Sequence, residues 1–186
     1  MVLQVKAENF GDVSADKAES WADVFANDLA NLPRPLIIHI SEYQYCDVLA
    51  AFYSAQTPGT RVLFTSNPEI APNVVQFYCS DALDSQLRCE IYRYADVVVA
   101  ANADDAVNAL LCGAAVAALP TGDVLATLGR DGRGPQNDFP MTVGAVEADL
   151  SVAIAKATRC DKLGAAVAGY RLVHARSATP IEISNN

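Results

Sequence analysis

Short apolar blocks alternate along this chain of 186 residues with longer segments of helical periodicity. The blocks are residues 2–5, 36–41 (LIIHIS), 61–66 (RVLFTS), 73–78, 96–101 and 115–119. Such alternation is typical of α/β proteins, because parallel strands must be joined by crossover connections long enough to hold a helix. We therefore predict an α/β fold over residues 1–186: a single Rossmann-like domain with a mostly parallel sheet and helices on both faces.

The segments between the blocks predict helices. Their ranges are 14–32, 41–55, a helix through Leu83, Leu87 and Ile91, 103–112, 147–158 and 161–176. Ser41 and Gln44 have the spacing of a capping box, and Gly113 is suited to end the helix before it. Residues 129–140 (GRDGRGPQNDFP) are too rich in Gly and Pro for a regular element and predict a loop.

Composition excludes several classes of protein. A net charge of −9 argues against nucleic-acid binding, which needs clustered Lys and Arg. Apolar residues make up 52% and charged residues 19%, which argues against disorder. No long uninterrupted apolar run and no signal-like N-terminus occur, so we expect a cytoplasmic protein without a membrane span. The five cysteines form no CxxC pair, so we expect reduced thiols, no metal and no cofactor.

Motifs of common catalytic classes are missing. The sequence has no G-x-G-x-x-G, no Walker loop and no G-x-S-x-G, which disfavours the usual nicotinamide, ATP and serine-hydrolase sites. The two histidines are His39, inside an apolar block, and His174, near the end of the last helix. We interpret His39 as a core residue rather than a general base, and leave the catalytic residues unassigned.

Residues 90–134 resemble a known family. The segment EIYRYADVVVAANADDAVNALLCGAAVAALPTGDVLATLGRDGRG is similar to the C-terminal, nucleotide-sugar-binding lobe of GT-B glycosyltransferases. In that family a helix leads into an "ADv-v" strand, a helix ends in "E-A-x-A-C-G-x-P-V-V-A", and a Gly-containing turn and a "D-G-x-x-G" segment follow. Residues 146–175 are similar to the family's final helices.

The resemblance implies a site for a UDP- or GDP-linked sugar. The donor diphosphate would lie over the helix start at Thr121-Gly122-Asp123, where free N–H groups favour an anion, although Asp123 itself would repel it. The donor loop would begin at Asn102, with Asp105 on the helix after it. Asn108 and Ala126 stand where the family keeps glutamates. The substrate-binding residues implied are Asn102, Asp105, Asn108, Thr121 and Gly122.

Two other interpretations stay open. The family's N-terminal lobe, which carries the acceptor, has no counterpart in these 186 residues, and with the lost glutamates this favours a catalytically degenerate lobe. The same lobe would then serve as a non-catalytic assembly protein that binds a protein partner or a second copy, with the tyrosine-rich segment 43–53 as interface. The alanine-rich segments also permit an all-α subunit, like a phycobiliprotein or a rod-virus coat protein.

Overall fold

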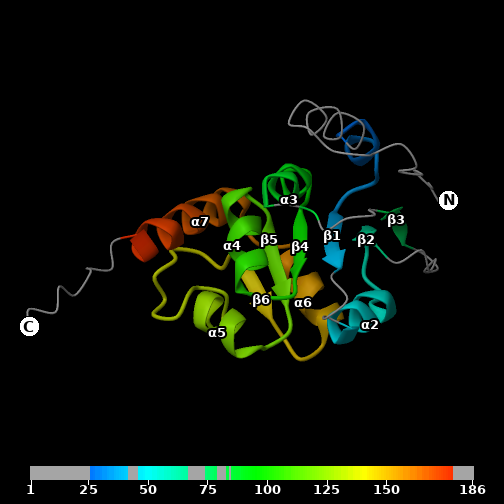
Figure 1. Ribbon diagram of the computed structural model, residues 1–186. Coiled ribbons are helices and arrows are strands. Elements are labelled where there is room, and N and C mark those ends of the chain that lie inside the picture. Colours follow the sequence, from blue (N-terminus) through cyan, green and yellow to red (C-terminus); the bar gives the residue numbers. More distant parts are fainter. Residues whose placement is uncertain (1–25, 42–45, 67–73, 79–82, 84, 178–186) are drawn as a thin grey trace, which may run out of the picture.

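Six parallel strands form one sheet in the order β3-β2-β1-β4-β5-β6 (Figure 1). The computed structural model describes residues 26–41, 46–66, 74–78, 83 and 85–177. The strands are β1 (Leu36–Ser41), β2 (Thr60–Thr65), β3 (Val75–Tyr78), β4 (Val97–Ala100), β5 (Ala115–Ala118) and β6 (Gly144–Val146). Every pairing is parallel. The predicted Rossmann-like α/β fold is confirmed, and the all-α alternative is wrong.

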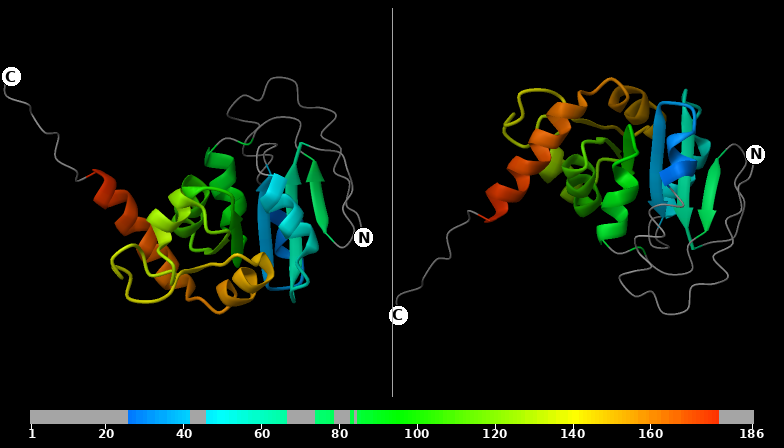
Figure 2. Two further views of the ribbon diagram at one scale, coloured as in Figure 1. Left: turned by 90° about the horizontal axis from the view of Figure 1, so that it is seen from below. Right: turned by 90° about the horizontal axis from the view of Figure 1, so that it is seen from above.

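Helices cover both faces of this sheet (Figure 2). They are α2 (Cys46–Ser54), α3 (Ser85–Tyr92), α4 (Ala103–Leu111), α5 (Gly122–Leu128), α6 (Leu150–Ala157) and α7 (Lys162–Ser177). One apolar core joins the sheet to α3, α4, α5 and α7, and the other joins it to α2 and α6. None of the helices in the described ranges is long and apolar enough to cross a membrane.

Most of the strands are runs of buried, mainly apolar residues. In β1, side chains alternate between the two cores: Ile38 and Ile40 face the α3 and α4 side, and Ile37 faces the α2 and α6 side. Both faces are covered, so β4 and β5 are buried along their whole lengths. This double burial explains why the apolar blocks are continuous rather than alternating.

The direction in which successive strands are added to the sheet reverses between β1 and β4. The chain builds outward from β1 through β2 to β3, then returns to β4 on the other side of β1. The β1–β2 ladder extends over all six residues of β1, whereas the β1–β4 ladder is limited to Ile37 with Val97 and Ile38 with Val98. Both strands continue past the last pair toward their carboxyl ends. In open α/β sheets, ligands bind outside the carboxyl ends at such a switch point.

One element, β6, was not predicted from the sequence. The last strand was expected at 115–119, but β6 adds a further strand that pairs with β5. Its three residues, Gly-Ala-Val, are too short for a period-two pattern to be visible. Helix α2 is described from Cys46 to Ser54, within the predicted helix 41–55, and residues 42–45, where that helix would start, lie outside the described residues. The expected strand at 2–5, most of helix 14–32 and Gln44 of the capping box lie outside the described residues, although residues 26–30 are helical.

Candidate functional site

Two turns meet at the carboxyl edge of the sheet. One follows β4 and begins α4 at Asn102; the other follows β5 and begins α5 at Thr121. A hydrogen bond joins them directly, because the backbone N–H of Ala103 donates to Oδ2 of Asp123 at 2.9 Å. The two helix starts that the sequence singled out as a ligand site are therefore neighbours, beside the switch between β1 and β4 (Figure 1).

Asn102 caps α4. Its backbone is extended, with φ −150° and ψ 177°, and its Oδ1 accepts a hydrogen bond from the N–H of Asp105 at 2.9 Å. The Asn102 carbonyl accepts the N–H of Ala106, which begins the helical ladder. An asparagine at this position satisfies one of the otherwise free N–H groups of the first turn. Asn102 thus has a structural role at the site, and its predicted contact with a ligand stays a prediction.

Asp123 supplies a carboxylate to the start of α4. Hydrogen bonds from the Ala103 N–H and from the Thr121 hydroxyl lower the pKa of Asp123, because both favour the charged form. This carboxylate therefore lies at the positive end of α4, in the position that an anionic ligand would favour. Thr121 does not cap its own helix through its side chain. Gly122 is exposed, and a Cβ built on it would have nothing within 4 Å.

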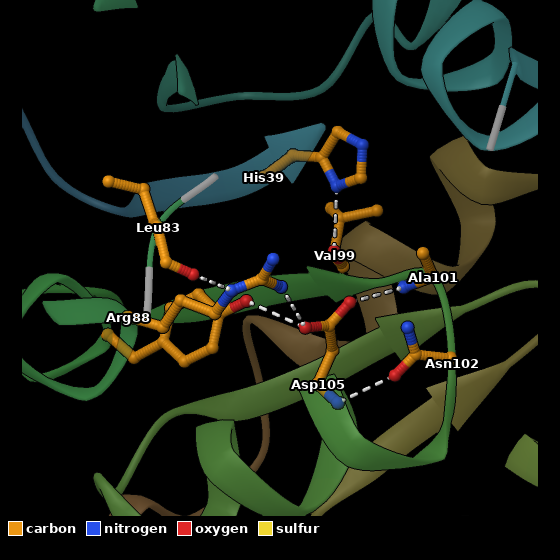
Figure 3. Close-up of polar contacts among 8 residues, drawn as sticks. His39, Leu83, Arg88, Val99, Ala101, Asn102 and Asp105 are labelled. Atoms are coloured by element: carbon orange, nitrogen blue, oxygen red, sulfur yellow. Dashed lines mark hydrogen bonds and ion pairs between the residues drawn. The ribbon is translucent and has the colours of Figure 1, made fainter. Parts of the chain in front are cut away.

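Asp105 is buried beneath the first turn of α4. The residue is 4% exposed, and its Oδ1 accepts hydrogen bonds from Arg88 Nη1 at 2.9 Å and the Tyr92 hydroxyl at 3.3 Å. Its Oδ2 lies 3.4 Å from the backbone nitrogen of Ala101 (Figure 3). Burial and the nearby Asp105 carboxylate raise the pKa of Tyr92 well above its usual value. The contacts make Asp105 part of a buried polar network, and its ligand role stays a prediction.

Arg88 and Tyr92 were not singled out from the sequence. They lie four residues apart on one face of α3, and Figure 3 shows the Arg88 guanidinium between the Leu83 carbonyl and Asp105. A buried carboxylate requires such a partner, because burial of an unpaired charge is costly. Their spacing of four residues indicates that Arg88 and Tyr92 lie on the same face of a helix. Their shared partner, Asp105, lies on another helix and could not be identified from the local sequence.

His39 crosses the gap where the β1–β4 ladder ends. Its Nδ1 donates to the Val99 carbonyl at 2.9 Å, so its side chain satisfies a β4 carbonyl beyond the last β1–β4 pair. The ring is fully buried and lies 5.4 Å from that of Phe52. Among the described residues, its Nε2 has no hydrogen-bond partner. Desolvation by burial lowers the pKa of His39, which keeps the ring neutral, in line with its interpretation as a core residue.

Asn108 lies further from this edge. It is half-buried and five residues after Ala103, which is about 7.5 Å along the helix axis. Its role toward a ribose hydroxyl stays a prediction, as do those of Thr121 and Gly122. Within the described ranges, no three His, Cys, Asp or Glu side chains are grouped so that they could hold a metal ion.

The chain is similar to solved structures but not to known sequences. No protein-family model and no curated protein sequence matches the chain. Among solved structures, the glycosyltransferase SnogD from Streptomyces nogalater is similar over 79% of this chain, with 15% sequence identity and a TM-score of 0.44. The chain spans 39% of the length of that protein.

Proposed function

We propose that this chain is a GT-B-like lobe that binds a nucleotide diphosphate sugar at the carboxyl edge of its sheet. The observation that supports this most is the junction of the α4 and α5 starts, joined through Ala103 and Asp123. Helix starts present backbone N–H groups and a positive dipole end, which suit a diphosphate. The sequence resemblance over residues 90–134 supports a sugar nucleotide as the ligand class.

Gly122 favours and Asp123 disfavours the binding of a phosphate at this helix start. The open surroundings of Gly122 allow a phosphate to approach the backbone closely. The Asp123 carboxylate already accepts the Ala103 N–H, so a phosphate must displace it or bind beside it. With neutral Asn108 and Ala126 in the places of family glutamates, the lobe would retain donor binding while lacking groups needed for efficient transfer.

The test is a thermal titration with UDP, GDP and UDP-linked sugars. A Kd of about 10 μM with ligand at about 1 mM stabilises the folded state by roughly 2.7 kcal/mol, which raises the Tm by about 5–10 °C. Asp123→Asn keeps an oxygen that can accept the Ala103 N–H but removes the charge, so it should tighten binding several-fold. Asp138→Asn, an exposed loop change of the same charge, is the matched control.

The thermal titration distinguishes three outcomes. A larger shift for the Asp123→Asn variant than for the parent and the Asp138→Asn control supports a phosphate site at the joined helix starts. Equal shifts for all three proteins place the nucleotide elsewhere. If no nucleotide shifts the Tm of any of the three proteins, the proposal that this chain binds a nucleotide-sugar donor is wrong.

The alternative function is assembly with a protein partner or a second copy. One observation favours it: Leu163, Val167 and Tyr170 form an exposed apolar stripe on α7, with Leu163 at 74% and Tyr170 at 62% exposure. The segment 43–53 fits this role less well, since Phe52 is fully buried against His39, and residues 43–45 lie outside the described ranges. Sedimentation velocity tests this alternative independently of nucleotide binding.

A further inference from the structure

Two free cysteines lie together where α3 packs against the end of α4. Cys89 is on α3, and Cys112 is the C-terminal cap of α4. The Cys112 thiol donates to the Cys89 carbonyl oxygen, with a distance of 3.2 Å from sulfur to oxygen. The side chain of Cys89 is also among the causes that raise the pKa of the Cys112 thiol, so the two side chains influence each other. Both residues are partly exposed, which allows a small oxidant to reach them.

The backbone around Cys112 can accommodate a bond between the two sulfurs. Cys112 is followed by Gly113, whose φ of +79° turns the chain out of the helix and into β5. A Cβ built on Gly113 would meet no atom closer than 3.8 Å, so this helix end is not tightly enclosed. A disulfide needs Cβ atoms about 3.5–4.5 Å apart. Because the Cys112 sulfur already lies 3.2 Å from the Cys89 carbonyl oxygen, we expect rotation of the two side chains, rather than a shift of whole elements, to bring the sulfurs together.

The two thiols differ in reactivity. Burial and the neighbouring Cys89 raise the pKa of Cys112 to about 12, and a thiol that stays protonated is a poor nucleophile. Glu90 and Arg93, which form an ion pair at 2.8 Å, also lie near this thiol. We therefore expect the first attack on the oxidant to come from Cys89. Cys112 reacts second, because its sulfur already lies beside Cys89, where the mixed disulfide forms. Cys160 has no comparable arrangement: its sulfur lies 3.7 Å from the Lys156 carbonyl.

We propose that Cys89 and Cys112 form a redox-sensitive pair that is oxidised to an intramolecular disulfide by a small disulfide such as oxidised glutathione. The Cys89 thiolate attacks one glutathione sulfur, and the first glutathione leaves as a thiolate. Cys112 then attacks the Cys89 sulfur of the mixed disulfide and displaces the second glutathione. The two protons lost by the cysteines are taken up by the two glutathione thiolates, so the oxidant is reduced to two thiols.

With the disulfide in place, both ends of α4 would be attached to α3. Arg88, the residue before Cys89, already holds Asp105 in the first turn of α4 through a buried ion pair. The new bond would hold the opposite end of the same helix through Cys112. Since α4 begins at the junction with Asp123, oxidation would make the helix start at the candidate ligand site more rigid. The inference itself rests on the thiol contacts alone and does not depend on nucleotide binding.

Peptide mapping of the oxidised full-length chain tests the proposal directly. Trypsin cleaves after Arg88, Arg93 and Arg130, so Cys89 and Cys112 fall in different peptides, 89–93 and 94–130. Treatment of the full chain with oxidised glutathione should join these peptides by a bond that a reductant breaks. Closing a loop of this size should raise the Tm by roughly 5–10 °C. Cys160→Ser is the matched control and should leave both results unchanged.

Single variants make the result unambiguous. Cys89→Ser and Cys112→Ser should each abolish the joined peptide and the oxidant-dependent Tm shift, while the untreated variants keep a cooperative transition. Cys89→Ser should also leave Cys112 largely unmodified. A product in which peptides 89–93 and 94–130 stay separate would overturn the proposal. So would a joined peptide that forms only between two chains, which is recognised as a dimer on a non-reducing gel.

Discussion

His39 is a titratable residue that is fully buried in the core. The neutral ring donates through Nδ1 to Val99, and its Nε2 has no partner within the described part of the chain. Protonation of Nε2 would therefore place a positive charge in the core without compensation, which explains why burial lowers the pKa of this group.

Because of this histidine, the folded state should become less stable as the pH is lowered. The unfolded chain binds a proton at His39 near pH 6.5, whereas the folded chain does so only at lower pH. The unfolded state thus binds more protons, and the free energy of unfolding decreases as the pH falls below about 6.5, by at most about 1.4 kcal/mol per unit. Urea titrations at a series of pH values measure this. His39→Gln should flatten the dependence between about pH 7 and 5.

His174 is the control for this measurement, because it is exposed and its ring is tilted by 50° against that of Tyr170. The His174→Gln variant removes a histidine from the surface rather than from the core, so comparing the two variants isolates the effect of burial at His39. Equal slopes for the parent and the His39→Gln variant would show that the His39 ring titrates normally and would contradict its burial as a neutral group.

The ion pair of Arg88 and Asp105 should matter far more than the other pair on α3. Their side chains are 12% and 5% exposed, so Arg88→Met leaves a buried carboxylate without its cation and should cost about 3–5 kcal/mol. Arg93→Met removes an exposed pair with Glu90 from the same helix and should cost less than about 1 kcal/mol. Urea midpoints measure both. Similar losses for the two variants would show that the buried network is not needed for stability.

At the scale of elements, α4 and α7 pack unusually closely at Gly169. A Cβ there would lie 2.4 Å from the Leu111 nitrogen and 2.6 Å from the Leu110 carbonyl carbon, both backbone atoms of α4. The helices can approach this far because Gly169 has no side chain, and Ala165 and Ala168 on the same helix are fully buried. This contact positions the C-terminal end of α4.

Gly169→Ala should separate these helices. The backbone of α4 cannot yield as a side chain can, so the variant should lose about 1–3 kcal/mol in urea unfolding. Gly122→Ala, at the start of α5, places its Cβ where nothing lies within 4 Å, and should change stability by less than about 1 kcal/mol. If Gly169→Ala is as stable as Gly122→Ala, α7 does not pack on α4 as described.

The elements were more predictable than the contacts between them. Continuous apolar blocks identified β1, β2, β4 and β5 because burial on both faces makes a whole strand apolar. The three-residue β6 carried no such pattern. At the site, Asn102 was predicted as a ligand-binding residue, whereas the structure shows it as the cap of α4, a role that depends only on the helix next to it. Arg88 with Asp105, and Asp123 with Ala103, join residues 17 and 20 apart, and such pairings depend on the fold rather than on local sequence.

At the scale of the whole molecule, α7 is apolar on two sides. Its buried side packs on α4, while Leu163, Val167 and Tyr170 recur at steps of four and three residues on the exposed side. A helix with apolar residues on both sides is normally covered on both. Single exposed apolar residues are ordinary on protein surfaces, but an aligned stripe is a feature of interaction sites.

We expect this stripe to mediate association between copies of the chain. Burying Leu163 and Tyr170 in a contact would contribute more than about 1.4 kcal/mol, so the double change Leu163→Ser with Tyr170→Ser should weaken the dimer at least about tenfold. Sedimentation velocity over a range of concentrations measures the dissociation constant. Met141→Ser, which removes an apolar side chain 50% exposed in the 129–143 segment, should leave it unchanged. A parent chain that sediments as a monomer at every concentration would show that the stripe does not join two copies, and would remove the observation that favours self-assembly.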